Sequence, residues 1–308
     1  MRLHDIRPRE VALGRSPILR PKKPVTSPPP ANYLEPFFVG LFEGDGAIAF
    51  GKTKDDNWSY PRLKINLKLN SENEAMLELI RFHIGGLTHR QRKKKGNDIL
   101  WTPRGQKHCS HVLKIFDKYP LLTSSKICQY DYLKQCMSNR AWSYHLETRD
   151  RRYDKQQQMV EYYKQNFIIP HYFGPWLSGF IESSGSFRST NGFSVDLGLY
   201  NDWYILNAIK TYFHSHQKLG IRGRRRFWSL RVHQDHGGTR FAWGLKGRFK
   251  QPPISAVGLS KKHPGPQYRL SMSGKPTIDH IIKHFEKNPL LGYKKVSYDL
   301  FCERYRLS

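Results

Sequence analysis

Acidic residues, cysteine and long apolar runs are all scarce in this sequence. The 308 residues include only 25 Asp and Glu against 52 Lys and Arg. No stretch approaches the roughly 18 apolar residues of a membrane-spanning helix, so we expect no membrane partner. The four cysteines are too few and too scattered for a disulfide scaffold, and the lack of a CxxC pair argues against a structural zinc site; they are Cys109, Cys128, Cys136 and Cys302.

Positive charge is what the chain has in excess. Its formal net charge is +27 at pH 7. A folded chain with this charge repels itself unless a polyanion neutralises it, so nucleic acid is the expected partner. Hydrophobic residues make up 38% of the sequence and aromatic residues 13%. This composition predicts a folded core, in one large domain or two of ordinary size.

Residues 1–32 are typical of an extended basic arm. The first 31 residues hold seven prolines, and seven Lys and Arg against two acids. Proline fixes φ and removes a backbone donor, so this stretch is unsuited to helices or sheet ladders. We expect it to lie against RNA.

Three blocks of sequence recur in the same order, which indicates an internal duplication. The segment FFVGLFEGDGAIAF (37–50) returns as PWLSGFIESSGSFR (175–188), and LNSENEAMLELIRFHI (69–84) returns as YNDWYILNAIKTYFHS (200–215). The segment KYPLLTSSKICQYDYL (118–133) returns as KNPLLGYKKVSYDLF (287–301). We therefore predict two units, 33–137 and 172–308, joined by a charged connector at 138–171.

Local patterns within the first unit predict an α+β fold. Residues 33–46 are mostly apolar and of helix length, and residues 63–69 alternate apolar and polar as in a half-buried strand. Ser71, with Glu74 three residues later, predicts the start of a helix. A hairpin is expected around 87–102, followed by helical segments.

Basic side chains concentrate in three places that suit phosphate contacts. One is an insertion at about 222–264 in the second unit, which also carries aromatic residues suited to base stacking. Its candidate binding residues are Arg222, Arg224, Arg225, Arg226, Trp228, Arg231, Arg240, Trp243, Arg248 and Lys250. The others are the strand face of Arg62, Lys64 and Lys68, and the hairpin segment with Arg90, Arg92, Lys93, Lys94 and Lys95.

Small residues four apart occur in both copies of the first block, at Gly40 and Gly44 and at Gly179 and Ser183. They would let two helix backbones approach closely. Each helix is expected to end at a glycine, Gly46 or Gly185, in a left-handed cap.

The segments VGLFEGDGAI and SGFIESSGSF resemble two copies of the LAGLIDADG motif. The chain from about Tyr33 to Tyr305 resembles the monomeric, two-repeat LAGLIDADG homing endonucleases and intron maturases of organelles. This resemblance implies two pseudo-symmetric αββαββα repeats that form a saddle-shaped nucleic-acid-binding sheet in a pseudo-dimeric monomer. It also implies a mitochondrial location.

The resemblance further implies that the carboxylate before each terminal glycine holds a divalent metal. Asp45 occupies this position in the first repeat, but Ser184 occupies it in the second. A neutral hydroxyl is a poor Mg²⁺ ligand. Glu182 lies about 200° around the helix from Ser184 and matches Glu43, a position more structural than catalytic in the family. We expect no metal, or one at Asp45 at most, and a Mg²⁺ cofactor only if cleavage is retained.

Two lysines complete the site that the resemblance implies. Lys126, with either Lys294 or Lys295, matches the basic residues near the family's active centre. In a degraded enzyme these lysines would remain as phosphate contacts.

Three functions fit the sequence. The favoured one is a structural RNA-binding protein derived from a homing endonuclease, a component of the mitochondrial ribosome that contacts rRNA and ribosomal proteins. The second is a group I intron maturase. The third is a Mg²⁺-dependent DNA endonuclease or nickase. The missing second acid favours a protein that does not cleave, and RNA is preferred over DNA as the ligand.

Overall fold

The structure is a computed structural model that describes residues 31–52, 59–93, 96–222 and 265–308. Residues 1–30 of the predicted arm, residues 53–58 and 94–95, and residues 223–264 of the predicted insertion lie outside these ranges, whereas the last two residues predicted for the arm, 31 and 32, begin the first helix. The first repeat runs in the order α1 (Ala31–Asp45), β1 (Gly46–Lys52), β2 (Ser59–Lys68), α2 (Ser71–Ile84), β3 (Leu87–Lys93), β4 (Gly96–Thr102), α3 (Gly105–Lys118) and α4 (Ser124–Asn139).

The second repeat follows the same order. It consists of α7 (Phe173–Ser184), β5 (Ser186–Arg188), β6 (Ser194–Tyr200), α8 (Trp203–Tyr212), β7 (Gly220–Arg222), β8 (Gln267–Ser273), α9 (Lys275–Lys287) and α10 (Tyr293–Arg306). The predicted α+β class with two pseudo-symmetric repeats is confirmed, and each repeat ends in two helices. The predicted insertion falls between β7 and β8.

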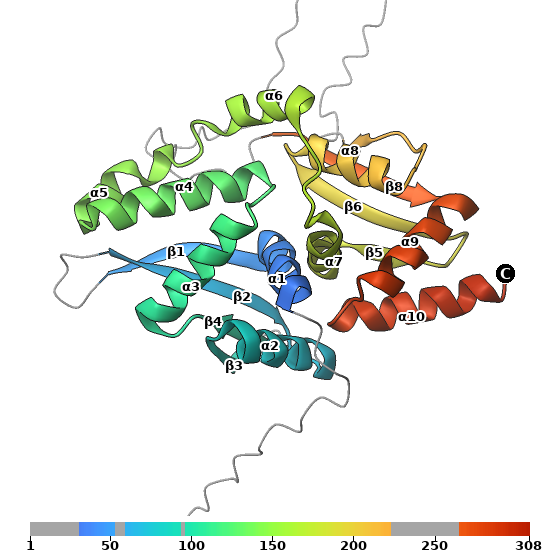
Figure 1. The fold of residues 1–308 in the computed structure, drawn as a ribbon, viewed down its shortest axis with the longest axis horizontal. Helices are drawn as coiled ribbons and strands as arrows, with labels where there is room; N and C mark the ends of the chain where they lie inside the picture. Colours follow the sequence, from blue (N-terminus) through green and yellow to red (C-terminus); the bar gives the residue numbers. More distant parts are fainter. Residues whose placement is uncertain (1–30, 53–58, 94–95, 223–264) are drawn as a thin grey trace, which may run out of the picture.

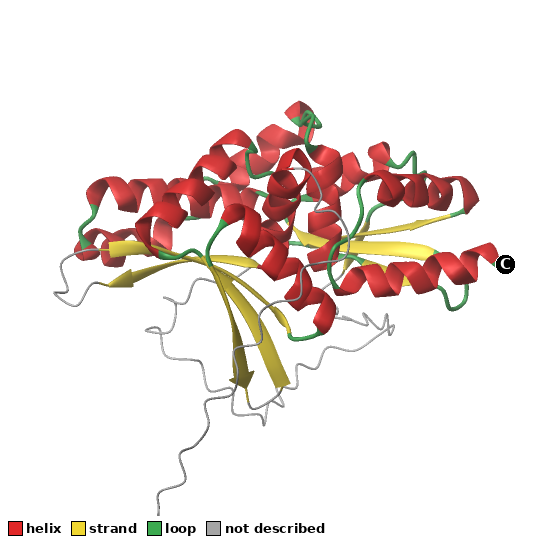
Figure 2. Ribbon diagram, turned by 60° about the horizontal axis from the view of Figure 1, so that its bottom comes forward, coloured by secondary structure: helices red, strands yellow, loops and turns green. Residues whose placement is uncertain are grey.

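Each repeat builds a four-stranded antiparallel sheet with the same strand order, β1-β2-β4-β3 and β5-β6-β8-β7. Leu63, Ile65 and Leu67 of β2 are buried, as their alternation predicts. Ile65 pairs with Trp101, and residues paired across strands share a face, so one face of the sheet packs on the core. Helices cover this face in both repeats, and no described element covers the other (Figure 2). We call the second face the free face.

The motif helices α1 and α7 lie side by side between the two sheets (Figure 1). Phe37, Phe38 and Phe42 are fully buried in α1, and Trp176 and Phe180 are buried in α7. Apolar residues point in several directions from these helices because each contacts both repeats. Such a pattern is typical of a central helix rather than one at the surface.

The connector forms α5 (Trp142–Thr148), the short 3₁₀ helix η1 (Arg149–Arg151) and α6 (Gln156–Asn166). Gln156 Nε2 donates to Ser124 Oγ at 2.9 Å. The Tyr163 and Phe167 rings lie 5.1 and 5.2 Å from the Tyr204 ring of α8. The connector is therefore a helical tether between the repeats.

Two predictions of helix ends were wrong in detail. The N-cap of α2 is Asn70, whose side chain accepts a hydrogen bond from the Asn73 backbone N–H, and Ser71 is already the first helical residue. Gly185 is extended, with φ −78° and ψ 157°, and Gly46 is not among the residues with positive φ. Glycine is needed there for space, because a Cβ would lie 2.3 Å from the Phe42 carbonyl oxygen at Gly46 and 2.5 Å from Ile181 Cγ2 at Gly185.

Each repeat also contacts the other through its PLL segment, which is residues 120–122 in the first repeat and residues 289–291 in the second. The Tyr172 hydroxyl donates to the Pro120 carbonyl at 2.6 Å, and the equivalent Tyr33 hydroxyl donates to the Pro289 carbonyl. These reciprocal bonds explain why the PLL segment recurs with the motif. None of the described helices has the length and apolarity needed to cross a bilayer.

Asp202 extends this contact between repeats and makes stability depend on pH. It is buried at the start of α8 and accepts from the Ser124 backbone N–H at 3.2 Å. Burial raises the pKa of its carboxyl to about 7, and Glu43 nearby adds to the shift. In the unfolded chain this carboxyl titrates near 3.9. Between these values the folded state binds a proton that the unfolded state lacks, so stability is lost as pH rises from about 4 to about 7.

We therefore expect the free energy of unfolding of the wild type, relative to D202N, to fall between pH 4 and pH 7. The difference should change by up to about 1.4 kcal/mol per pH unit. Urea unfolding at several pH values measures it, and comparison of the two variants removes the contribution of other groups. Parallel pH curves for the two proteins would contradict the prediction.

Candidate nucleic-acid interface

The two motif helices touch backbone to backbone. A Cβ built at Gly40 would lie 1.9 Å from the Trp176 carbonyl oxygen, and one built at Gly179 would lie 1.9 Å from the Phe37 carbonyl oxygen. These contacts are reciprocal, as expected of a pseudo-dimer. The predicted close approach through small residues is therefore present.

This approach brings the C-terminal ends of the motif helices together. A Cβ at Gly44 would lie 1.7 Å from Ser183 Oγ and 2.9 Å from Ser184 Oγ. Asp45 ends α1 and Ser184 ends α7, so the two sequence positions implied as catalytic sit at one junction. Ser184 Oγ lies 3.1 Å from Ser183 Oγ, which in turn donates to the Phe180 carbonyl.

Glu43 binds the two residues that lead into α4. Its carboxylate is buried and accepts from the backbone N–H groups of Leu122 and Thr123 at 2.8 and 2.7 Å. It also accepts from Trp176 Nε1 of the other repeat at 2.9 Å. Burial raises the pKa of Glu43, and these hydrogen bonds oppose the shift.

Glu182 repeats this arrangement at α10. It accepts from the backbone N–H groups of Gly292 and Lys294 at 3.1 and 2.8 Å. Both motif glutamates thus satisfy backbone donors at a helix N-terminus, where negative charge is favoured. Because the Glu182 carboxylate accepts these backbone hydrogen bonds, it does not replace the acid missing at position 184.

Asp45 lies among cations. It is open to solvent on one side, yet the surrounding protein desolvates it enough to raise the pKa of its carboxyl to about 6, against the opposing effect of Lys294 and Lys126. Lys126 is buried, and its ammonium donates to the Gly46 carbonyl. Of the two predicted alternatives, Lys294 is the one near Asp45, whereas Lys295 pairs with Asp299 at 2.6 Å.

The possible metal ligands at this junction do not fit the divalent metals that the resemblance implies. The junction supplies the Asp45 carboxylate, two serine hydroxyls, and a Gly46 carbonyl that already accepts from Lys126. Mg²⁺ is held in a near-octahedral set of oxygens from one or two carboxylates, phosphates and water, and two metal ions between two scissile phosphates need more than the single carboxylate present here. Among the described residues there is no group of three or more His, Cys, Asp or Glu that could hold a metal ion.

The free face of the first sheet is basic. Arg62, Lys64 and Lys68 are exposed on β2, alternate with the buried leucines and isoleucine, and so all point away from the helices. Their neighbours on β1 are small, because Lys64 pairs with Ala47 and Arg62 with Ala49. Three predicted phosphate contacts thus share one accessible surface.

The strand register places Arg90 and Arg92 on the other face. Arg90 pairs with Ile99, whose side chain is buried under the helices. It reaches Glu74 of α2 through two hydrogen bonds of 2.8 Å. Arg90 and Arg92 therefore lie on the opposite face from Arg62, Lys64 and Lys68, which the sequence did not show because either alternate set of strand residues can point inward.

The free face of the second sheet carries a charge cluster that sequence reasoning missed. Arg188 of β5 pairs with Asp196 of β6, and Arg269 of β8 lies 3.6 Å from the same carboxylate. Burial alone would raise the pKa of Asp196, but Arg188, Ser271 and Arg269 lower it below its ordinary value. The alternation in the strand segment QYRLSMS was the signal that could have identified Arg269. These arginines are partly neutralised, so the first sheet has the stronger net positive charge.

Two further predicted binding residues lie at strand ends. Lys93 and Arg222 are the last residues of β3 and β7. The rest fall outside the described residues: Lys94, Lys95, Arg224, Arg225, Arg226, Trp228, Arg231, Arg240, Trp243, Arg248 and Lys250. Their roles stay predictions.

Solved structures show the same fold. The LAGLIDADG meganuclease I-AabMI bound to uncleaved DNA aligns with a TM-score of 0.53 at 18% identity, covering 89% of this chain and 90% of that one. The homing endonuclease I-GzeII in complex with its DNA target aligns with a TM-score of 0.54 at 16% identity, covering 87% and 88%.

Sequence comparison defines the family. A profile of the LAGLIDADG endonuclease family matches residues 38–137. A probable intron-encoded endonuclease aI3 of Dictyostelium citrinum is 31% identical over 272 residues, covering 87% of this chain and 93% of that protein. The protein of the same name from Debaryomyces hansenii is 30% identical over 217 residues, and the match spans 60% of this chain but only 31% of that protein. The chain belongs to the LAGLIDADG endonuclease family.

Proposed function

We propose that this protein binds nucleic acid over the free faces of its two sheets without cutting it. The observation that carries this proposal is the junction of α1 and α7, where Asp45 stands beside Ser184 and no second free carboxylate. Glu43 and Glu182, the other motif acids, are bound to backbone N–H groups. Cleavage of both strands needs metal-held water and leaving groups at two phosphates, which this donor set does not support.

The basic surface supports binding independently of cleavage. Arg62, Lys64 and Lys68 point outward from β2, and Lys294 lies near the helix ends. Phosphate neutralisation needs charge and geometry, and no metal. The names of the relatives, intron-encoded endonucleases, also support a nucleic-acid ligand.

The ligand in this proposal is structured RNA in a mitochondrial ribosome. The net charge of +27 is larger than the few basic residues on one sheet surface account for. Nineteen Lys and Arg lie elsewhere, in the first 31 residues and in 215–266. Basic segments interleaved with aromatic residues suit RNA, whose unpaired bases stack on aromatic rings. A folded RNA can contact several sides of a protein, whereas a DNA duplex would occupy only the free faces.

Purification from the native source at moderate and at high salt tests the ligand. Nucleic acid that remains bound is sequenced, and the accompanying proteins are identified. We expect rRNA and ribosomal proteins in stoichiometric amounts. Intron RNA without ribosomal proteins would indicate a maturase instead, and a single DNA locus would indicate an endonuclease; either result overturns the ribosomal assignment.

A cleavage assay tests the lost activity separately. The wild type is incubated with Mg²⁺ and a plasmid library of randomised sites, beside the S184D variant that restores the second acid. We expect no linear product from the wild type, because Ser184 cannot replace a carboxylate ligand. Linear product from S184D alone would assign the loss to this position, whereas linear product from the wild type would contradict the proposal.

A further inference from the structure

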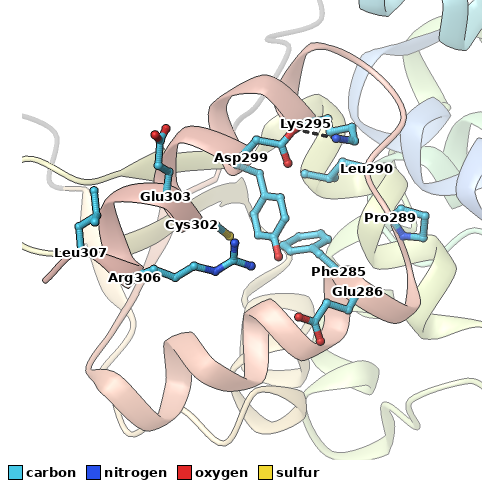
Figure 3. A pocket seen from close by; sticks show the side chains of 11 residues that line it. Phe285, Glu286, Pro289, Leu290, Lys295, Asp299, Cys302, Glu303, Arg306 and Leu307 are labelled. Atoms are coloured by element: carbon cyan, nitrogen blue, oxygen red, sulfur yellow. Dashed lines mark hydrogen bonds and ion pairs between the residues drawn. The ribbon is translucent and has the colours of Figure 1, made fainter.

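A groove between α9 and α10 lies away from the free faces of the sheets. It encloses about 650 Å³ (Figure 3). Phe285, Leu290 and Cys302 make its apolar floor and are buried. Three acids line its rim, Glu286, Asp299 and Glu303, against the cations Lys295 and Arg306. An excess of acid is unusual for a surface of a chain with net charge +27.

In the first repeat, a lysine side chain occupies the equivalent place between α3 and α4. Lys134 Nζ of α4 lies 2.8 Å from Asp117 Oδ1 of α3 and 4.3 Å from the centre of the Tyr130 ring. The Tyr130 hydroxyl donates to the same carboxylate at 2.9 Å. One ammonium group therefore bridges the two helices through an ion pair and a cation–π contact.

The second repeat keeps an acid and a tyrosine at the equivalent positions but lacks the lysine, and the Tyr298 hydroxyl donates to the Ile282 carbonyl at 3.4 Å and not to the acid. The shared KYPLL and KNPLL segments align Asp117 with Glu286, and the shared Tyr-Asp pairs align Tyr130 with Tyr298. The residue aligned with Lys134 is then Cys302. Its short, buried side chain cannot reach the carboxylate, so the acid and the aromatic ring face an open groove.

Glu286 is therefore an acceptor without a cation. It is exposed, and within residues 31–52, 59–93, 96–222 and 265–308 no ion pair joins it. Lys295, on the same groove, is paired with Asp299 at 2.6 Å. Arg306 extends from α10 into the groove but makes no ion pair with Glu286 (Figure 3). The open position has room for a positively charged group at the end of a long, unbranched side chain.

We propose that this groove binds a lysine side chain of a partner protein. The lysine enters with its ammonium against the Glu286 carboxylate and its stem over the Tyr298 ring, in the place that Lys134 fills in the first repeat. Apolar neighbours of that lysine cover Phe285 and Leu290. Nucleic acid is excluded as the occupant because the rim carries more acid than base. This inference does not depend on the proposed function.

A labelled peptide tests the proposal with the full chain, freed of nucleic acid by high salt. The probe is an acetylated and C-terminally amidated Ala-Leu helix with one central lysine and a net-neutral rhodamine label, and its control carries methionine in place of that lysine. Fluorescence anisotropy should show at least tenfold tighter binding of the lysine peptide. Most of the protein repels a cationic peptide, so nonspecific binding is suppressed.

Matched variants identify the site. E286Q changes an exposed side chain, should fold normally, and should weaken lysine-peptide binding at least tenfold. C302K places a lysine of the chain itself in the groove, so it should also abolish binding of the peptide. K134C opens the equivalent place in the first repeat, so the stoichiometry should rise from one peptide to two.

Several outcomes would overturn the proposal. Equal binding of the lysine and methionine peptides, or unchanged binding to E286Q, would remove the role of the carboxylate. Binding only after R306A would show that Arg306 itself fills the groove. Self-association in sedimentation that E286Q abolishes would make a second copy of this chain the occupant, in place of a partner protein.

Discussion

Replacing Arg62, Lys64 and Lys68 together by alanine is expected to lower affinity for structured RNA on the order of 100-fold near physiological salt. Each phosphate contact releases counterions from the nucleic acid, and this release favours binding. Loss of three contacts should also reduce the slope of log affinity against log salt by about two to three. The side chains are exposed on the free face, so the substitutions should leave folding intact.

The same strand system supplies the control. R90A/R92A removes two positive charges from β3, the edge strand of the same sheet, but on the face toward the helices, where Arg90 binds Glu74. Filter binding or anisotropy across a salt series compares the two variants. If the control weakened binding as much per charge as the triple variant, net charge and not the free face would determine affinity, and the proposed interface would be wrong.

Gly40→Val is expected to destabilise the fold by about 3 kcal/mol or more, near the upper end of overpacking effects. A Cβ at this position would overlap the Trp176 carbonyl oxygen, which belongs to backbone and cannot rotate away. The helices α1 and α7 must separate to admit the side chain. This separation would also disturb Glu43, which accepts from Trp176 Nε1.

Urea unfolding measures this loss, and Gly198→Val is the matched control. A Cβ at Gly198, on the free face of β6, would find its nearest neighbour at an ordinary 3.6 Å. This control should change stability by less than about 1 kcal/mol. The double variant with G179V should cost less than the sum of the single variants, because both act on one helix contact. Full additivity would show that the two glycines do not share a contact.

The internal repeat explains why much of the fold could be predicted from the sequence. Recurrence of the motif and the PLL segment indicated two units that pack by pseudo-symmetry. Alternation in β2 identified Leu63, Ile65 and Leu67 as core residues. The small residues Gly40 and Gly179 indicated the close helix pair. Each of these signals is local or periodic, so residue order alone can carry it.

The candidate site was predictable only in part. Asp45 and Ser184 stand at a motif position, and the sequence shows directly that one acid is absent. The sequence did not show on which face Arg90 and Arg92 lie, because the hairpin register decides which alternate residues face the helices. The glycines after the motif were expected to supply a left-handed turn, but Gly46 and Gly185 are required for space.

By itself, the sequence determined the duplicated organisation, the excess positive charge and the loss of the second motif acid. These properties follow from residue identity and spacing. Only the tertiary structure decided that Lys294 and not Lys295 lies near Asp45, that Glu43 and Glu182 cap helices, and that the groove of Cys302 stays open. Each of these features depends on contacts between side chains from distant segments of the chain. The packing of α1 against α7, and of the last helix of each repeat against its sheet, determines those contacts.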